Sequence, residues 1–351
     1  MNQTVKGRGA QHKPDNRFEK RSIALDSLDG LDEYTQFDTV KTEILYESPK
    51  EIVNKVKSPD VGMAYSLNPY QGCEHGCVYC YARTTHEFWG YNAGLDFESK
   101  IIVKKNAAAL LERTLLKKSW QVKPIILSGN TDCYQPIEQK LRITRSLLQV
   151  FSDYRHPVGI ITKNVGLLND LDLLEDLAQD NLVRVILSIT SLDEQMRSKL
   201  EPRTATAKRK LDAIQVLSEK GIPVSVMTAP IIPGINHHEI PEIIKQAAAR
   251  GAVNAGYTVV RLNGAIGEIF QKWLKTHFPD RHDKVWHQIK SLHNGEVKDA
   301  EFDRRMKGDG EEAKMIKQLF DAAIKKYMDG GQKIQLNTKV FRRGGNFNLF
   351  G

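Results

Sequence analysis

The chain has 351 residues, 40% of them hydrophobic, which is enough for one large domain with extensions or for two small domains. No apolar run approaches the roughly 18 residues that a membrane-spanning helix needs. The first residues lack the apolar stretch of a signal peptide. The four cysteines do not make a disulfide framework, because three of them are clustered. We therefore expect a cytoplasmic protein with no membrane partner.

The formal net charge of +8 is carried by the two ends of the chain. Residues 1–21 hold six basic and two acidic side chains, and residues 331–351 hold four basic and no acidic ones, which leaves the body between them neutral. Basic tails suit phosphate contacts with a nucleic acid, but they are equally ordinary as solvated termini. Charge alone therefore leaves DNA as a candidate partner without requiring it.

The predicted elements alternate regularly after a polar start. Residues 1–60 are expected to form an N-terminal extension, with a short strand and a helix within residues 38–57. Residues 61–265 form the expected core, whose apolar runs predict strands at 64–67, 124–128, 158–162, 183–188, 223–227 and 255–261. Helices are predicted at 107–117, 137–151, 166–179, 193–200, 207–220 and 240–250. Residues 266–351 are expected to form a C-terminal extension, with aromatic residues in 273–293, a helix over 311–328 and a basic tail.

Strands and helices that alternate at this spacing indicate right-handed βαβ units and a parallel sheet. The predicted fold class is α/β, either an incomplete (β/α)6 barrel of the TIM type or a doubly wound open sheet. In such barrels, ligands bind at the C-terminal ends of the strands. Small polar residues follow the predicted strands at 128–135, 162–164, 188–190 and 228–236. The sequence therefore predicts a polar ligand site at this rim.

Three of the four cysteines lie within eight residues, as Cys73, Cys77 and Cys80 in the spacing C-x3-C-x2-C. Thiolates are soft ligands that favour iron–sulfur clusters, zinc or copper(I). A structural zinc site needs four ligands, and His75 or His86 could supply the fourth. A [4Fe–4S] cluster normally takes four cysteines, so three would leave one iron open to bind another molecule. The loop alone leaves both metals as candidates, for an enzyme or for a non-catalytic metal-binding protein.

The same loop, with Tyr81 directly after the third cysteine and Ala-Arg behind it, resembles the cluster loop of radical S-adenosylmethionine (SAM) enzymes. Segments spread over about residues 63–262 resemble, in order, the spore photoproduct lyase branch: 77–81, 129–132, 161–163, 187–189, 200–204 and 229–231. Residues 7–10 and 16–19 look like those of uncharacterised bacterial relatives described as photolyase-like. The resemblance implies a (β/α)6 barrel with one [4Fe–4S] cluster and SAM on its open iron. It also implies a flavodoxin- or ferredoxin-type electron donor and reductive cleavage of SAM to a 5′-deoxyadenosyl radical.

Carried over by position, the resemblance implies a role for each matching residue. Cys73, Cys77 and Cys80 would hold the cluster. The SAM contacts would be Thr131 and Asp132 at the amino group or ribose, Lys163 at the carboxylate, Ser188 at the ribose, and the backbone of Ala229, Pro230 and Ile231 at the adenine. Tyr79 and Tyr81 would pack on SAM or relay a hydrogen atom.

One position departs from the family pattern. The lyases carry a hydrogen-donating cysteine just before the Thr/Ser-Asp pair, where this chain has Gly129. Cys133 follows Asp132 directly and is the candidate replacement, with a small buried residue as the alternative. The departure puts the lyase route of thymine-lesion repair in doubt for this chain.

The favoured function is a lyase-like radical SAM enzyme that acts on a DNA lesion, with RNA, a peptide or a metabolite as alternative substrates. A basic run is a candidate nucleic-acid contact, although a solvated helix face is the alternative: Arg203, Lys208, Arg209 and Lys210. Aromatic residues could stack on bases or anchor the core: Trp89, Trp273, Trp286, Phe341, Phe347 and Phe350.

Overall fold

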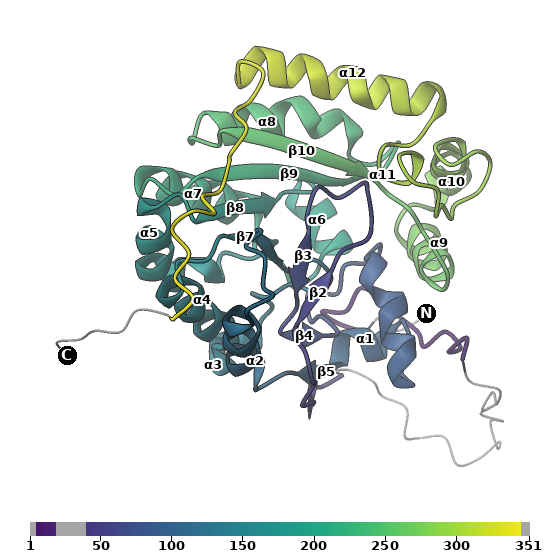
Figure 1. The fold of residues 1–351 in the computed structure, drawn as a ribbon. Helices are drawn as coiled ribbons and strands as arrows, with labels where there is room; N and C mark the ends of the chain where they lie inside the picture. The colour runs from purple at the N-terminus through teal and green to yellow at the C-terminus, as the bar shows by residue number, and fades with distance from the viewer. Residues whose placement is uncertain (1–4, 19–39, 345–351) are drawn as a thin grey trace.

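The computed structural model describes residues 5–18 and 40–344, and its centre is a seven-stranded sheet (Figure 1). Six strands run parallel in chain order, and β2 (Val53–Lys55) pairs antiparallel with the first of them. The parallel strands are β3 (Tyr65–Leu67), β6 (Ile125–Leu127), β7 (Val158–Thr162), β8 (Val183–Ser188), β9 (Val224–Ile231) and β10 (Asn254–Val259). Each overlaps a predicted strand. The end strands β10 and β2 do not pair with each other within the described residues, so the sheet is an open (β/α)6 barrel, as predicted.

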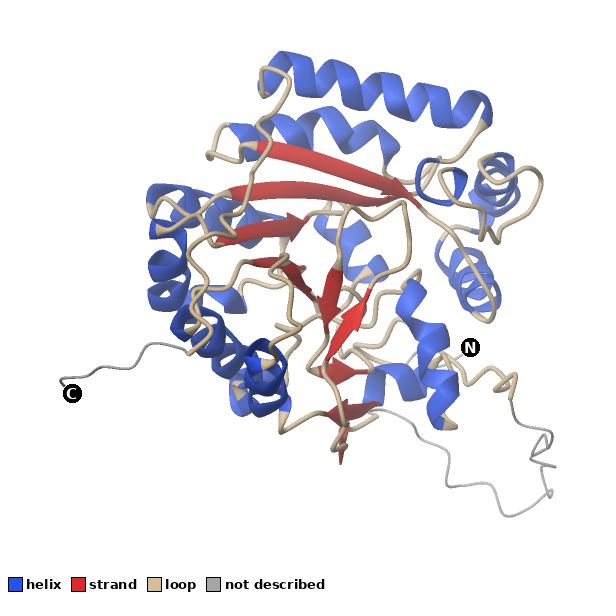
Figure 2. Ribbon diagram, viewed as in Figure 1, coloured by secondary structure: helices blue, strands red, loops and turns tan. Residues whose placement is uncertain are grey.

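Helices cover the outside of this sheet (Figure 2). They are α2 (Ala107–Leu116), α3 (Glu138–Leu141), α4 (Ile143–Asp153), the 3-10 helix η2 (Gly166–Asp170), α5 (Leu171–Gln179), α6 (Glu194–Leu200), α7 (Ala207–Glu219), the 3-10 helix η3 (His237–Glu239) and α8 (Ile240–Ala248). Their apolar faces and the strands share one core, in which Leu147, Ile160 and Leu217 are fully buried. Removing such a side chain from water stabilises the fold by about 1.5–3 kcal/mol. The periodic apolar positions therefore explain the layers of this barrel.

The helix predicted over residues 137–151 is divided in two. Arg142 has φ = 50° and ends α3, and α4 starts at the next residue. Glu138 supports the break, because one of its carboxylate oxygens accepts the backbone N–H of Thr144 at 2.8 Å. This side chain thus takes the place of a helical carbonyl, which an apolar periodicity cannot reveal.

The helix predicted within residues 38–57 is wrong. The described part of this stretch forms β1 (Glu43–Tyr46) and β2, separated by an irregular segment that contains Pro49. A proline there cannot donate a hydrogen bond within a helix. Strand β1 instead pairs parallel with β5 (Lys100–Val103), which also pairs with β4 (Tyr70–Gln71) in a second small sheet.

The C-terminal part packs on two sides of the barrel. It contains α9 (Ile266–His277), the 3-10 helix η4 (Pro279–Arg281), α10 (His282–Ser291), α11 (Arg304–Lys307) and α12 (Gly310–Tyr327). Helix α9 buries Phe270 and Trp273 against Cys77 and Tyr79, whereas α12 lies along α8 (Figure 1). The chain then crosses the barrel as far as residue 344, and residues 345–351 of the basic tail lie outside the described part. No helix in the described residues is long and apolar enough to cross a membrane.

The first described segment, residues 5–18, lies against the cysteine loop. Glu98 of α1 (Leu95–Ser99) accepts the backbone N–H groups of Gly9 at 3.0 Å and Ala10 at 2.7 Å. The same carboxylate pairs with Arg83 at 2.5 Å, and Arg83 Nε donates to the carbonyl of Cys77 at 2.9 Å. Arg83 and Glu98 are both fully buried. This ion pair therefore joins the N-terminal segment to the loop.

We expect Gly9→Ala to loosen the cysteine loop, because the added Cβ would stand 1.8 Å from the carbonyl oxygen of Gly76. Amide hydrogen exchange of residues 72–83 should accelerate by about tenfold or more, whereas β7 and β8 should be unaffected. Gly62→Ala is the matched control, since nothing lies within 4 Å of a Cβ at that position. Equal exchange in the two variants would show that the segment does not hold the loop.

Candidate active site at the C-terminal rim of the barrel

The cysteine loop runs from β4 into the 3-10 helix η1 (Tyr81–Trp89) at the C-terminal ends of the parallel strands. Side chains and backbone groups that follow β6 hold it there. The amide oxygen of Gln135 accepts the backbone N–H of Glu74 at 2.9 Å, and the hydroxyl of Tyr81 donates to the carbonyl of Gly129 at 2.6 Å. Gly76 has φ = 69°, and a Cβ on it would meet a Glu98 carboxylate oxygen at 2.8 Å. Glycine at this turn thus permits the close approach of α1.

The three thiols of the loop are close neighbours in a mostly apolar setting. Cys73 and Cys77 are buried, and Cys80 is half-buried and packs with the apolar groups around both. Burial raises the pKa of Cys73, and the nearby Asp132 and the other two thiols raise it further. Burial and the nearby Glu201 also raise the pKa of Cys77. Thiolates in such a place need a cationic partner, so the chemistry of the loop fits a metal cluster.

The geometry does not favour zinc in this loop. His75 turns instead toward Asp132, with 3.4 Å between Nδ1 and Oδ2. His86 is buried against the rings of Tyr91 and Phe97. A cluster of several irons spans more space than one ion, and three neighbouring thiols suit it better.

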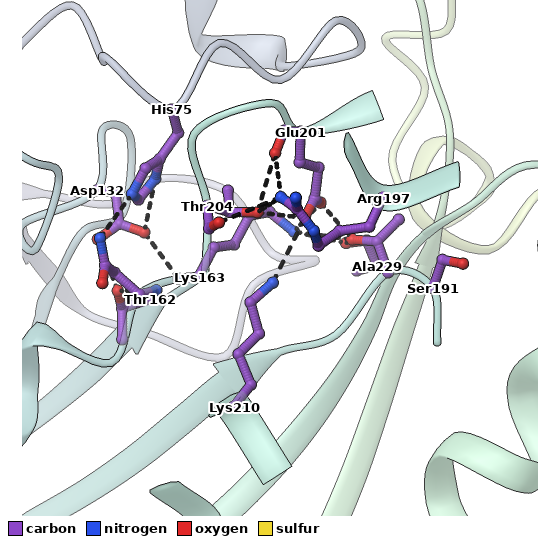
Figure 3. A network of polar contacts seen from close by, with 12 residues as sticks. His75, Asp132, Thr162, Lys163, Ser191, Arg197, Glu201, Thr204, Lys210 and Ala229 are labelled. Carbon is purple, nitrogen blue, oxygen red and sulfur yellow. Dashed lines mark hydrogen bonds and ion pairs between the residues drawn. The ribbon is translucent and has the colours of Figure 1, made fainter. Parts of the chain in front are cut away.

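Lys163 follows β7 by one residue and enters a buried polar network below the loop (Figure 3). Its ammonium lies 3.0 Å from Glu201 Oε1 and donates to Thr190 Oγ1 at 3.1 Å and to the carbonyl of Ala229 at 3.0 Å. Lys210 Nζ lies 3.4 Å from the other oxygen of Glu201. Hydrogen bonds and ion pairs thereby connect the C-terminal ends of β7, β8 and β9 to the carboxylate of Glu201.

Glu201 is fully buried and accepts five donors, which are Tyr79 OH, Thr190 Oγ1, Thr204 Oγ1, Lys163 Nζ and Lys210 Nζ. Burial would raise the pKa of Glu201, but Lys163 and Lys210 together hold it well below its usual range. The carboxylate is therefore ionised, and two ammonium groups share it. This excess of positive charge lies beside Cys77 and complements a thiolate-ligated cluster, so the residues present fit that group.

The sequence did not assign a role to Glu201. It lies in the segment 200–204 that resembles the lyases. A glutamate between two helices is nevertheless expected to be exposed, because the sequence does not show that its lysine partners are buried. Lys210 belongs to the basic run that the sequence offers as a nucleic-acid contact or a solvated helix face, but it is only 1% exposed. Of the same run, Arg203 Nη2 lies 3.5 Å from Glu74, and only Lys208 and Arg209 are exposed. The proposed four-residue basic surface is therefore not present as such.

The other residues predicted to contact SAM line the same rim. Asp132 accepts Thr162 Oγ1 at 2.7 Å and the backbone N–H of Lys163 at 2.8 Å, and these donors together with His75 lower its pKa against the effect of burial. Thr131 donates to the carbonyl of Tyr70 at 2.6 Å and is buried. Two sets come from strand ends: Ser188, the last residue of β8, and Ala229, Pro230 and Ile231, the last three of β9. The structure thus brings the predicted contacts together, with several of their side chains already bonded to the protein.

The three candidate catalytic residues lie in different settings. Tyr79 is buried, and its hydroxyl donates to Glu201. Tyr81 is 47% exposed, and its hydroxyl donates to the carbonyl of Gly129. Cys133 has no exposed surface and packs in the main core, with its backbone N–H donated to Ser128 Oγ at 2.7 Å.

The candidate aromatic contacts divide in the same way. Trp273 is buried in the core against the cysteine loop, and Trp286 packs at the edge of that core. Phe341 packs on the main core, whereas Trp89 is 41% exposed on η1. Phe347 and Phe350 lie outside the described residues.

We expect Glu201→Gln to destabilise the fold by about 3–5 kcal/mol, because it leaves two buried ammonium groups without their carboxylate. Urea unfolding followed by circular dichroism would measure this. Glu194→Gln is the control: Glu194 is 52% exposed and pairs with Arg197 at 2.6 Å, so its loss should cost less than about 1 kcal/mol. Similar unfolding midpoints for the two variants would contradict the central role of Glu201.

Comparison with known proteins identifies the superfamily of this chain. The model of the radical SAM superfamily matches residues 67–247, more than half of the chain. An uncharacterized protein of Mycobacterium tuberculosis (strain ATCC 25618 / H37Rv) is 32% identical over 234 residues, which cover 66% of this chain and 69% of the relative. An uncharacterized protein of Methanocaldococcus jannaschii is 31% identical over 195 residues, which cover 56% and 70%.

Among solved structures, spore photoproduct lyase complexed with dinucleoside spore photoproduct has a similar fold, with a TM-score of 0.60. It is 16% identical in sequence, and the match covers 84% of this chain and 81% of the lyase. At this identity the similarity concerns the fold alone. The predicted superfamily is confirmed by the family match: the chain belongs to the radical SAM superfamily, whose enzymes use a [4Fe–4S] cluster and SAM.

Proposed function

We propose that this protein is a radical SAM enzyme that holds one [4Fe–4S] cluster on Cys73, Cys77 and Cys80. The observation that carries the proposal is the loop of three thiols at the open rim, beside two lysines that share one carboxylate. When bound and supplied with an electron, the cluster and SAM provide a 5′-deoxyadenosyl radical that abstracts hydrogen from a C–H bond. The electron would come from a flavodoxin- or ferredoxin-type partner. An oxygen-sensitive centre and four free thiols favour a cytoplasmic location.

The chain's own residues would orient SAM around this loop. The proposed contacts are Thr131, Asp132, Lys163, Ser188, Ala229, Pro230 and Ile231. Lys163 would exchange one of its three present acceptors for the SAM carboxylate, because its ammonium has only three N–H donors and the protein already occupies them. Since Glu201 also accepts Tyr79 and Lys210, this carboxylate would hold Lys163 in place before SAM arrives.

Of the three candidate catalytic residues, Tyr81 is the best placed to transfer a hydrogen atom. Its ring is half-exposed at the rim and its hydroxyl lies at Gly129. Tyr79 would act by positioning, since its hydroxyl is bonded to Glu201. Cys133 could act only after a rearrangement that exposes it, because its side chain lies in the core.

The proposed substrate is a DNA lesion. The support is similarity of fold to a lyase solved with a dinucleoside photoproduct, together with the lyase-like segments of the sequence. RNA, a peptide or a metabolite is the alternative substrate, and the glycine at position 129 argues for a hydrogen-transfer route different from that of the lyases. Incubation of ultraviolet-irradiated oligonucleotides with protein, SAM and reductant under anaerobic conditions would decide, with restored thymine measured by chromatography. Unchanged photoproduct beside active SAM cleavage would exclude this substrate.

We expect Cys77→Ala to abolish iron binding and SAM cleavage. After anaerobic reconstitution, the unaltered protein should carry about four irons per chain and form 5′-deoxyadenosine under reductant. The matched control is Cys133→Ala, which should retain its iron because Cys133 lies in the core away from the loop. A colourless protein with one zinc per chain would refute the cluster assignment, and a Cys77→Ala variant that still cleaves SAM would refute the ligand assignment.

A further inference from the structure

Arg261 follows β10 by two residues, so it stands on the same rim of the barrel as the cysteine loop. Its guanidinium carbon lies 5.5 Å from the centre of the Tyr81 ring. Tyr81 is the residue directly after Cys80, and it is 47% exposed. A half-buried cation and a half-exposed aromatic ring are therefore neighbours at the edge of the proposed active site.

Within residues 5–18 and 40–344, no hydrogen bond or ion pair reaches the guanidinium of Arg261. The two nearest acidic groups are already occupied. One oxygen of Asp60 accepts a backbone N–H at 2.9 Å, and the other pairs with Arg305 Nε. Asp299 accepts His293 Nδ1 at 3.1 Å and Arg304 Nε at 2.8 Å. Of the three neighbouring arginines, two are thus fixed by carboxylates, and Arg261 alone lacks an acceptor in the described part of the chain.

The guanidinium of Arg261 is partly withdrawn from water. Burial lowers the pKa of Arg261, and the nearby Arg305 lowers it further. An arginine carries five N–H donors, and none of those of Arg261 is among the fully buried unpaired groups of the described chain, so they stay open to a ligand at the rim. A bound anion would restore the missing hydrogen bonds, and carboxylate or phosphate matches the fork of the guanidinium.

We propose that Arg261 and Tyr81 together bind one nucleotide unit of the substrate, with the phosphate on Arg261 and the base on the exposed part of the Tyr81 ring. The ring is the feature that favours a nucleic-acid strand, because a base can stack on an aromatic side chain while its phosphate meets a cation nearby. A free carboxylate would pair with Arg261 but would not stack on the Tyr81 ring. The inference deepens the proposed function and rests on it, since it places the substrate next to the cluster loop.

The test is the equilibrium binding of a fluorescein-labelled single-stranded oligodeoxythymidylate of about 12 nucleotides to the full chain, followed by anisotropy at several salt concentrations. Arg261→Gln should weaken binding by about tenfold. It should also reduce the slope of log affinity on log salt by about 0.7, the value for one lost phosphate contact to a single strand. Arg261→Lys should recover part of the affinity, because the charge returns without the fork.

Arg281→Gln is the matched control, since it removes the same charge from an exposed position in η4. It should leave the affinity nearly unchanged. Equal losses in the two glutamine variants would overturn the proposal in favour of unspecific attraction. No loss with Arg261→Gln, or no binding by the unaltered protein, would overturn it as well.

Two further measurements distinguish the ligand. An oligonucleotide with uncharged methylphosphonate linkages should bind the unaltered protein at least as weakly as the natural strand binds Arg261→Gln, because it loses every phosphate contact. Equal affinity for both strands, or displacement of the strand by an acidic peptide in a manner that requires Arg261, would refute phosphate recognition. If Arg261→Gln weakens the binding of SAM and not of the oligonucleotide, Arg261 belongs to the SAM site. Binding through Arg261 in a protein that forms no 5′-deoxyadenosine would contradict the proposed function and leave the phosphate contact standing.

Discussion

The site depends on one buried carboxylate. Glu201 joins a tyrosine of the cysteine loop, a threonine that follows β8, a lysine that follows β7 and a lysine of α7. The strand ends of an open barrel could otherwise shift, because no hydrogen bonding within the described residues closes the sheet. An ionised group with several charged and hydroxyl donors fixes their spacing, since moving any donor leaves a buried charge poorly compensated. The loop that carries the thiols therefore rests on an electrostatic support as well as on apolar packing.

The order of strands and helices could be predicted because it depends on local patterns. The runs at 158–162 and 183–188 are continuous and apolar, and they become β7 and β8 with the predicted bounds. Parallel strands buried on both faces require such runs. The small sheet was missed, since β1 and β4 are short and gain their partners only through β5, which is far away in the sequence.

The chemistry of the site was partly predictable for a similar reason. Three cysteines in one loop can be recognised by their spacing. The Glu201 network that holds this loop cannot, because it is made by contacts between residues distant in the sequence. Lys210 looked like one member of a basic run, but it lies on the face of α7 that turns toward Glu201. A lysine and its buried partner cannot be recognised from either residue alone. The role proposed for Arg261 could not be predicted from the sequence, because it depends on the absence of an acceptor for this side chain within the described residues.

Residues 5–18 contact the cysteine loop although they lie outside the segment that matches the family. The family match begins at residue 67, and a chain started at residue 40 would keep every described strand of both sheets. Such a chain would lack the two backbone donors that occupy Glu98 and the close contact of Gly9 with Gly76 in the loop. Sequence similarity thus identifies the barrel and its cysteine loop, but residues 5–18, which precede the matched segment, also help to hold that loop.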